Sequence, residues 1–102
     1  MTTPCFRYQW DAAKALANRR KHGVSFDVAV GVFRDPLALT IADPAHSETE
    51  ERWITLGVVP ETGLLVVVHT WAEWSENEID VRMISARRAS RREQRDYEGG
   101  DL

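Results

Sequence analysis

The alternation of apolar and polar residues predicts a short strand over residues 6–10, in which aromatic side chains occupy every second position. The segment that follows, residues 12–22, predicts a helix with Asp11 as its N-cap. Gly23 can end this helix, because glycine adopts the left-handed conformation without strain. The apolar residues of the helix form a narrow stripe of mostly small side chains, Ala12, Ala13, Leu16 and Ala17. We expect this stripe to pack closely against the structure that it covers.

A second helix is predicted after Ser25, which can serve as its N-cap. Its apolar residues follow the i, i+3, i+4, i+7 spacing of a helix face, at Phe26, Ala29, Val30 and Phe33. The helix ends at Asp35 and Pro36, because the residue before a proline avoids the helical conformation. This helix is expected to present a full face to the core.

The second half of the chain predicts strands joined by short connections. The apolar runs predict strands over residues 37–41, 52–59, 64–68 and 79–86. The continuous run at 64–68 is typical of a central strand that is buried on both faces. The predicted connections are a loop over residues 43–49, a hairpin turn over 60–63 and a hairpin loop over 71–78.

The chain ends in a predicted helix with Ser90 as N-cap and Glu93 in the capping-box position, followed by Gly99 and Gly100. The order of elements is therefore strand, two helices, four strands and helix, in a single domain over residues 1–102. Such an order is typical of an α+β fold. We expect an antiparallel sheet with two N-terminal helices and a C-terminal helix, all packed on one face of the sheet.

The chain is long enough to bury one core without disulfides or a structural metal. Cys5 and the three histidines, His22, His46 and His69, show no metal-ligand spacing, so we expect neither a metal nor another cofactor. No apolar run is long enough to span a membrane. With one cysteine and no secretory signal, the chain is expected in the cytoplasm.

The formal net charge of −3 argues against a general nucleic-acid binder, but the charges are unevenly distributed. Residues 43–51 and 73–80 are acidic, whereas residues 82–95 are basic. The basic segment contains six arginines: Arg82, Arg87, Arg88, Arg91, Arg92 and Arg95. Because a guanidinium group can bind two phosphate oxygens at once, this segment is suited to a polyanion such as RNA or DNA.

The arginines also have a simpler explanation. Arg91, Arg92 and Arg95 fit the solvated face of an exposed helix, and for these three that interpretation is favoured. Arg82 and Arg87 lie on or just after an apolar strand, where a charge needs a partner or a function. For those two, a structural and a functional role are equally supported.

Other polar residues stand where predicted elements begin or end. Lys21 and His22 occupy the last turn of a helix, where the helix dipole favours cations, but a phosphate ligand and a proton-transfer group fit there equally well. Glu51 and Arg52 begin a strand, where charges protect an edge from aggregation. As functional residues, Glu51 could be a general base and Arg52 could neutralise a phosphoryl oxygen.

His69 and Tyr97 complete the set of candidates. A lone histidine at the end of an apolar strand fits a hydrogen-bonded core residue better than a catalytic one. Tyr97 could stack on a base, although burial against the sheet is favoured. The sequence contains no glycine-rich phosphate loop and no nucleophile elbow. RNA cleavage by this chain would therefore use the ribose 2′-OH as nucleophile, with a base to assist it and arginines to stabilise the developing charge.

Four motifs occur in order along nearly the whole chain: WDxxKxxxNxxKHGVSF, EERxxxxG, VVVHT and ISARxAxxxExxxYE. In this combination the sequence resembles the BrnT-type toxins of bacterial type II toxin–antitoxin systems. The resemblance implies a RelE-like fold and a ribonuclease that inhibits translation. It also implies a BrnA-like ribbon-helix-helix antitoxin, which binds operator DNA and forms a complex with two copies of each chain.

The resemblance places the recurrent polar residues of the family on eight positions: Lys21, His22, Glu51, Arg52, His69, Arg82, Arg87 and Tyr97. The first seven are the candidate catalytic residues. The candidate RNA-binding residues are Arg88, Arg91 and Tyr97. The candidate antitoxin-binding residues are Trp71, Trp74, Arg92 and Arg95.

The segment over residues 71–78 departs from the family, since it carries two tryptophans and three glutamates where a shorter, more basic loop is expected. These tryptophans fit a protein partner better than RNA. Two alternatives to a nuclease remain open. The chain could be a toxin that poisons gyrase, or a non-catalytic module that binds an antitoxin or nucleic acid.

Overall fold

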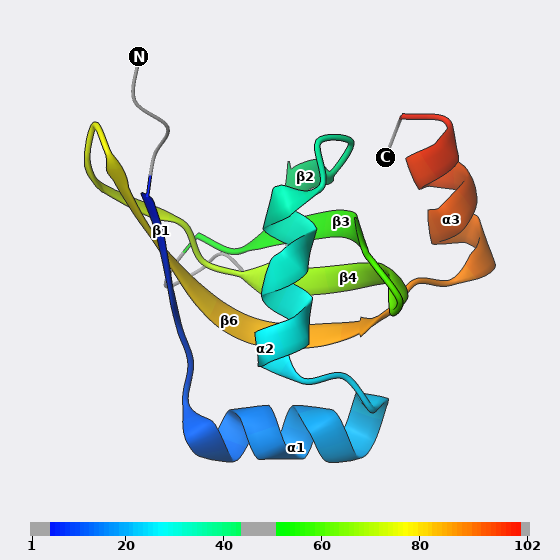
Figure 1. Cartoon of the computed structure of the whole chain (residues 1–102), viewed down its shortest axis with the longest axis horizontal. Helices are drawn as coiled ribbons and strands as arrows, with labels where there is room; N and C mark the ends of the chain where they lie inside the picture. The colour runs from blue at the N-terminus through cyan, green and yellow to red at the C-terminus, as the bar shows by residue number, and fades with distance from the viewer. Residues whose placement is uncertain (1–4, 44–50, 101–102) are drawn as a thin grey trace.

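The computed structural model describes residues 5–43 and 51–100, which form one sheet flanked by helices (Figure 1). The elements follow in the order β1 (Cys5–Gln9), α1 (Ala12–His22), α2 (Phe26–Ala29), the 3-10 helix η1 (Val30–Arg34), β2 (Leu39–Ala42), β3 (Trp53–Val59), β4 (Gly63–His69), β5 (Ala72–Ser75), β6 (Glu78–Arg88) and α3 (Arg91–Glu98). The predicted α+β class is confirmed. Apart from Asp43, the predicted loop over residues 43–49 lies outside the described residues.

The sheet has the strand order β1-β6-β4-β3-β2, and β5 also pairs with β6. The strands β2, β3, β4 and β6 pair antiparallel, as predicted. The prediction of a wholly antiparallel sheet is wrong at β1, which pairs parallel with β6. Only strands joined by a tight turn are forced to run antiparallel. Because most of the chain separates β1 from β6, no turn dictates their direction.

The predicted hairpin loop over residues 71–78 is also wrong in part, because it contains β5. This strand pairs antiparallel with the first residues of β6, Ala72 opposite Asp80. Ala72 and Trp74 alternate with Glu73 and Ser75, but four residues in a segment rich in glutamate are too short a pattern to predict a strand. Its partner β6 is longer than predicted and includes Arg87 and Arg88, which were expected in the turn after the strand.

The α2–η1 segment crosses one face of the sheet, which we call the core face (Figure 1). Phe26 and Val32 from this segment pack with Leu65, Val67 and Met83 from the strands, and none of the five is more than 1% exposed. Burial of these side chains is the main stabilising contribution of the fold.

The predicted helix after Ser25 is α-helical only over α2 and continues as the 3-10 helix η1. The packing beneath η1 is very tight. A Cβ atom on Gly57 of β3 would lie 2.9 Å from the carbonyl oxygen of Val32. A side chain at Gly57 would therefore push η1 away from the sheet. The apolar spacing along this segment identified Phe26 and Ala29 as buried, but Val30 and Phe33 are only partly buried and the fully buried Val32 was missed. The helix type was not predicted either.

Helix α1 lies along the edge of β6 and is attached there by one polar side chain. The Asn18 amide donates to the Ala86 carbonyl oxygen (2.9 Å) and to the Val24 carbonyl oxygen (3.0 Å), and its own oxygen accepts from the Ala86 amide (3.1 Å). Asn18 thus pairs with β6 as a neighbouring strand would. The expectation that a stripe of small apolar residues docks this helix is wrong, because Leu16 is 50% exposed and Asn18 is the buried residue of α1.

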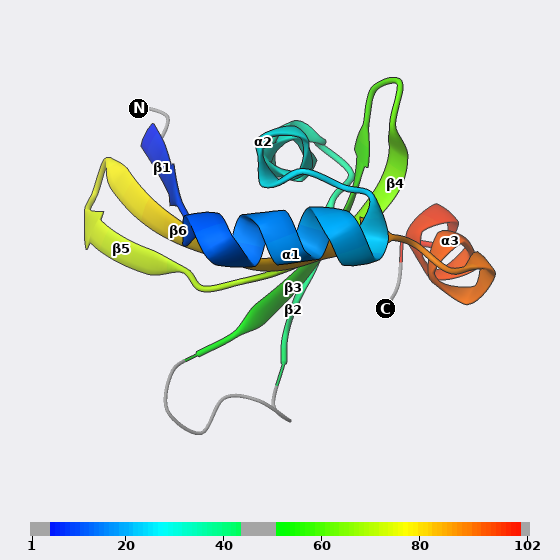
Figure 2. The ribbon, with the colours of Figure 1, turned by 90° about the horizontal axis from the view of Figure 1, so that it is seen from below.

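The opposite face of the sheet, which we call the open face, includes Ile54, Leu56 and Val66. Helix α3 lies on this side, whereas α2 lies on the core face, as the view from below shows (Figure 2). The expectation that all helices pack on one face is therefore wrong for α3. None of the residues of α3 is buried, and polar side chains hold it at both ends. No helix in the described part of the chain is long and apolar enough to cross a membrane.

Candidate active site on the open face

Two candidate arginines lie in one row across the open face. The Thr70 amide donates to the Arg82 carbonyl oxygen (3.0 Å), and the Arg82 amide donates to the Thr70 hydroxyl (3.2 Å). On the other side of Thr70, the pairing of Trp53 with His69 places Arg52 opposite Thr70. Since neighbouring strands are about 4.8 Å apart, Arg52 and Arg82 stand roughly 10 Å apart with Thr70 between them. Two arginine side chains that start from backbone positions at this spacing are long enough to reach one phosphate.

Arg87 belongs to a second row on the same face, where it pairs with Val66. Its guanidinium binds Glu93 of α3 through two parallel contacts, Nη1 to Oε1 and Nη2 to Oε2, both 2.8 Å. Glu93 also accepts from the Ser90 amide, and Ser90 caps Glu93 in return. The predicted capping box is confirmed, and it places a carboxylate in the fork of Arg87. In this structure Arg87 therefore holds the start of α3.

The same contacts make Glu93 sensitive to acid. The hydrogen bonds from Arg87 lower its pKa from an ordinary value of 4.5 to about 2. A carboxylate with a lowered folded-state pKa stabilises the fold above its unfolded pKa, and this contribution disappears as the pH falls towards the folded value. We therefore expect the melting temperature to fall more steeply between pH 4.5 and about 2 in the unaltered protein than in Glu93→Gln. Melting curves that shift equally with pH in both proteins would contradict this assignment.

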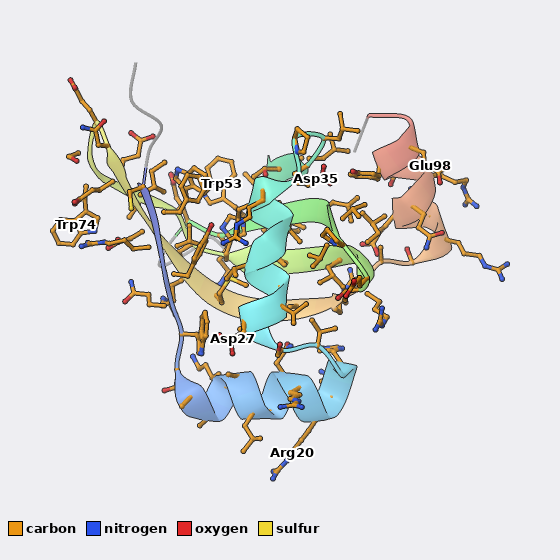
Figure 3. The ribbon with its side chains drawn as sticks, viewed as in Figure 1. Arg20, Asp27, Asp35, Trp53, Trp74 and Glu98 are labelled. Atoms are coloured by element: carbon orange, nitrogen blue, oxygen red, sulfur yellow. The ribbon has the colours of Figure 1, made fainter. Side chains whose placement is uncertain are left out.

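Tyr97 holds the other end of α3. Its hydroxyl donates to Asp35 over 2.5 Å, and this contact raises the pKa of Tyr97 to about 12. Asp35 also accepts from the amides of Leu37 and Val58, so one carboxylate joins η1, β3 and α3. Figure 3 shows Asp35 at the end of the α2–η1 segment that is nearer to α3. The structure thus gives Tyr97 a structural partner, and its role in RNA binding stays a prediction.

The other arginines of the basic segment have separate positions. Arg88 donates to the Thr62 carbonyl oxygen (2.6 Å) and lies beside the hairpin between β3 and β4. Arg91, Arg92 and Arg95 are exposed on α3. Of these three, Arg92 lines a groove of about 470 Å³ between α3 and the open face. The basic segment is therefore not one continuous surface.

Lys21 and His22 end α1, one turn beyond Asn18 and beside the last residues of β6. The structure does not place them in the row of Arg52 and Arg82. Glu51 is exposed and adjacent to Arg52 in the chain. Of Lys21, His22 and Glu51, Glu51 is thus the one whose backbone adjoins the arginine row.

His69 lies in the core and is fully buried. Its Nδ1 donates to the Thr70 carbonyl oxygen (2.9 Å), so Nε2 accepts from the Thr55 hydroxyl (2.7 Å), and Thr55 in turn bonds Thr40 (2.8 Å). Burial lowers the pKa of His69 and so favours the neutral ring. This geometry supports the structural alternative for His69 rather than a catalytic role.

The two tryptophans of the segment 71–78 differ. Trp71 packs its ring against Phe6, Phe33 and His69 on the core face. Its ring meets that of Phe6 edge to face, with 5.2 Å between the ring centroids. Trp74 is 65% exposed and stands at the far end of the molecule from α3 (Figure 3). Partner binding by Trp71 would therefore disturb the core, whereas Trp74 is accessible.

Sequence reasoning missed Thr70 as a member of the site. The alternation along the strand could have placed Thr70, because it is two residues after Val68 and therefore lies on the same face of the strand. Asn18 and Asp35 were missed because their partners are distant in the sequence. Among residues 5–43 and 51–100, no group of three or more His, Cys, Asp or Glu side chains is arranged to hold a metal ion.

Comparisons with known proteins bear on what this face does. A family model described as the ribonuclease toxin BrnT of type II toxin–antitoxin systems matches residues 10–93. The chain belongs to the BrnT family. The predicted resemblance is therefore confirmed, and membership of the BrnT family implies an RNA target and an antitoxin partner.

The crystal structure of the Brucella abortus ribonuclease toxin BrnT has a similar fold, with a TM-score of 0.55 and 21% sequence identity. The match covers 88% of this chain and 100% of the Brucella chain. At this identity, the similarity supports the BrnT fold. A search of curated proteins found no similar sequence.

Proposed function

We propose that this chain is an endoribonuclease toxin that cleaves RNA on its open face without a metal ion. The observation that carries the proposal is the row formed by Arg52, Thr70 and Arg82 on a chain of the BrnT ribonuclease family. Fixed guanidinium groups stabilise the negative charge that develops on a phosphoryl group during cleavage. They supply by hydrogen bonding what a divalent cation supplies in metal-dependent nucleases.

The proposed reaction is attack of the ribose 2′-oxygen on the adjacent phosphorus. The new bond closes a 2′,3′-cyclic phosphate, and the bond from phosphorus to the 5′-oxygen breaks. We assign Arg52 and Arg82 to the non-bridging phosphate oxygens, and Glu51 to acceptance of the 2′-hydroxyl proton. The 5′-oxygen takes a proton from water as it leaves. Lys21 and His22 lie beside the other end of β6, and we assign them to binding of the RNA strand rather than to the proton transfer.

The test is incubation of the purified protein with RNA in the presence of EDTA. We expect cleavage to continue, and the products to carry a 2′,3′-cyclic phosphate or a 3′-phosphate together with a free 5′-hydroxyl. Cleavage that EDTA abolishes and magnesium restores would contradict the metal-independent mechanism. A free 3′-hydroxyl would show that the 2′-oxygen is not the nucleophile.

We further propose that a BrnA-like ribbon-helix-helix antitoxin neutralises the toxin and binds operator DNA, in a complex with two copies of each chain. The groove between α3 and the open face supports this, because Ile41, 42% exposed, lies in it beside Leu56 and Arg92. An antitoxin segment seated there would lie next to Arg87 and would cover part of the RNA face. Arg95 is exposed on the same helix. Inhibition of translation, in the cytoplasm, would follow from RNA cleavage by the free toxin.

The same incubation separates this proposal from the alternatives. A non-catalytic module would bind the antitoxin but would leave RNA intact. A gyrase poison would leave RNA intact and would trap cleaved DNA on gyrase. The family description of the BrnT toxin as a ribonuclease favours RNA.

A further inference from the structure

Trp74 is exposed on the short strand β5, so the large apolar surface of its indole ring stays in contact with water. Its exposed fraction of 65% is among the highest of the large apolar side chains in the described part of the chain. An exposed aromatic ring can be an accidental surface residue or a preformed contact for a ligand. The surroundings of the ring distinguish these two explanations.

The indole ring is held in place by two charged residues from neighbouring strands. Its N–H donates to the Asp80 carboxylate of β6. The guanidinium of Arg7, on β1, lies 5.2 Å from the ring centroid, and it also binds Asp80 at 2.8 Å and 3.3 Å. These contacts fix the ring and cover one of its faces with a cation. The ring is therefore preorganised, and the side away from Arg7 remains open to a planar ligand.

This ring lies on the same face as the arginine row. Asp80 and Arg82 are two residues apart on β6, so their side chains point to the same side, about 7 Å apart along the strand. The pairing of Arg7 with Asp80, and of Gln9 with Arg82, continues this register onto β1. Trp74 contacts Asp80 from β5 and therefore stands on the face that carries Arg82, two residues further along β6.

We propose that Trp74 is a stacking platform for an RNA base next to the cleaved phosphate, with Arg7 and Asp80 as its positioning residues. The proposal rests on the proposed function, because it places the base relative to the phosphate between Arg52 and Arg82. Bases stack on aromatic side chains irrespective of sequence, and the arginine behind the ring holds the ring in position for stacking.

The structure favours RNA over a protein partner at this site. The apolar groove assigned to the antitoxin lies at α3, whereas Trp74 stands at the other end of the molecule (Figure 3). The other residues of β5 are small or polar, Ala72, Glu73 and Ser75, so β5 itself provides no apolar patch around Trp74 as a protein interface would. This assignment replaces the prediction from sequence that Trp74 binds the antitoxin.

The test uses a short RNA in which 2′-O-methyl groups prevent cleavage, so that binding is measured independently of the reaction. A second set of the same RNA carries an abasic nucleotide at each position in turn. Affinity is measured for the unaltered protein, Trp74→Ala and Trp74→Phe. Leu37→Ala serves as the matched control, because Leu37 is 69% exposed and lies beside the end of α3, away from Trp74.

We expect Trp74→Ala to bind the intact RNA about tenfold more weakly, and Trp74→Phe to retain most of the affinity. One abasic position should weaken binding by the unaltered protein by a similar factor and should have no further effect on Trp74→Ala. The Leu37→Ala variant should bind as the unaltered protein does. All variants should keep the melting temperature, since both side chains are exposed.

Equal RNA affinities of Trp74→Ala and the unaltered protein would overturn the assignment, as would an abasic effect that persists undiminished in Trp74→Ala. Loss of antitoxin affinity alone in Trp74→Ala would place the ring in a protein interface instead. Failure of the unaltered protein to bind any RNA would overturn the proposed function together with this inference. Binding without a contribution from Trp74 would overturn the inference alone.

Discussion

Replacing Arg82 by alanine is expected to slow RNA cleavage by about a hundredfold or more, with the fold unchanged. Arg82 lies on the open face with Thr70 bonded to its backbone, and its side chain is only partly buried. The guanidinium is assigned to the phosphoryl group, where charge accumulates in the transition state. Loss of one such donor lowers the rate of the chemical step far more than substrate affinity. Single-turnover cleavage of RNA with saturating enzyme measures this step.

The Arg82→Lys variant separates charge from geometry. Lysine keeps the positive charge but loses the planar fork, so we expect it to recover only part of the lost rate. A melting temperature within a few degrees of the unaltered protein shows that either variant is folded. A folded Arg82→Ala protein with full activity would remove Arg82 from the site.

Replacing Asn18 by alanine is expected to destabilise the fold by about 3 kcal/mol. Three buried backbone groups, the carbonyls of Val24 and Ala86 and the amide of Ala86, would lose their partners. The gain in helix propensity, roughly 0.5 kcal/mol, is too small to offset this loss. For a domain of this size, the melting temperature should fall by roughly 15 °C, as measured by circular dichroism.

Leu16→Ala is the matched control, because Leu16 is on the same helix and is 50% exposed. It should change the stability by less than about 0.5 kcal/mol. Asn18→Asp should also be strongly destabilising, since a carboxylate can accept from the Ala86 amide but cannot donate to the two carbonyls. A larger loss in Leu16→Ala than in Asn18→Ala would mean that apolar packing attaches α1.

The local elements of the fold follow from the sequence because their causes are local. Asp11, Ser25 and Ser90 cap helices as predicted, and Gly23 ends α1 with a φ of 71°. The hairpin between β3 and β4 and the central place of β4 also follow from the pattern of apolar residues. Each of these features depends on residues within a few positions of one another.

The features that the sequence could not reveal depend on distant partners. Asn18 is polar, so its side chain gave no sign that it would replace a missing strand beside Ala86. The parallel direction of β1 depends on contacts across most of the chain. The position of α3 on the open face depends on Asp35 and Arg87, which hold its two ends. Periodicity detects which residues are apolar, but not where such long-range polar contacts form.

The candidate site was predictable by residue type more than by arrangement. Arginine side chains indicated a polyanion, and the structure brings Arg52 and Arg82 into one row. It also pairs Arg87 with Glu93, where the sequence had supported a structural and a functional role equally, and it buries His69, as the favoured interpretation of the sequence indicated. For Trp74, the two tryptophans of one segment looked equivalent in sequence, although one packs in the core and the other is exposed.

RNA cleavage on the open face is tested most directly by comparing two variants that have each lost two arginine charges. One is the double variant Arg52→Ala with Arg82→Ala, and the other is Arg19→Ala with Arg20→Ala on α1, where Arg20 points away from the fold (Figure 3). Single-turnover RNA cleavage in EDTA is measured for both. We expect no detectable cleavage by the first and a rate within a few-fold of the unaltered protein for the second. Equal losses, or full activity in the open-face variant, would contradict RNA cleavage on the open face.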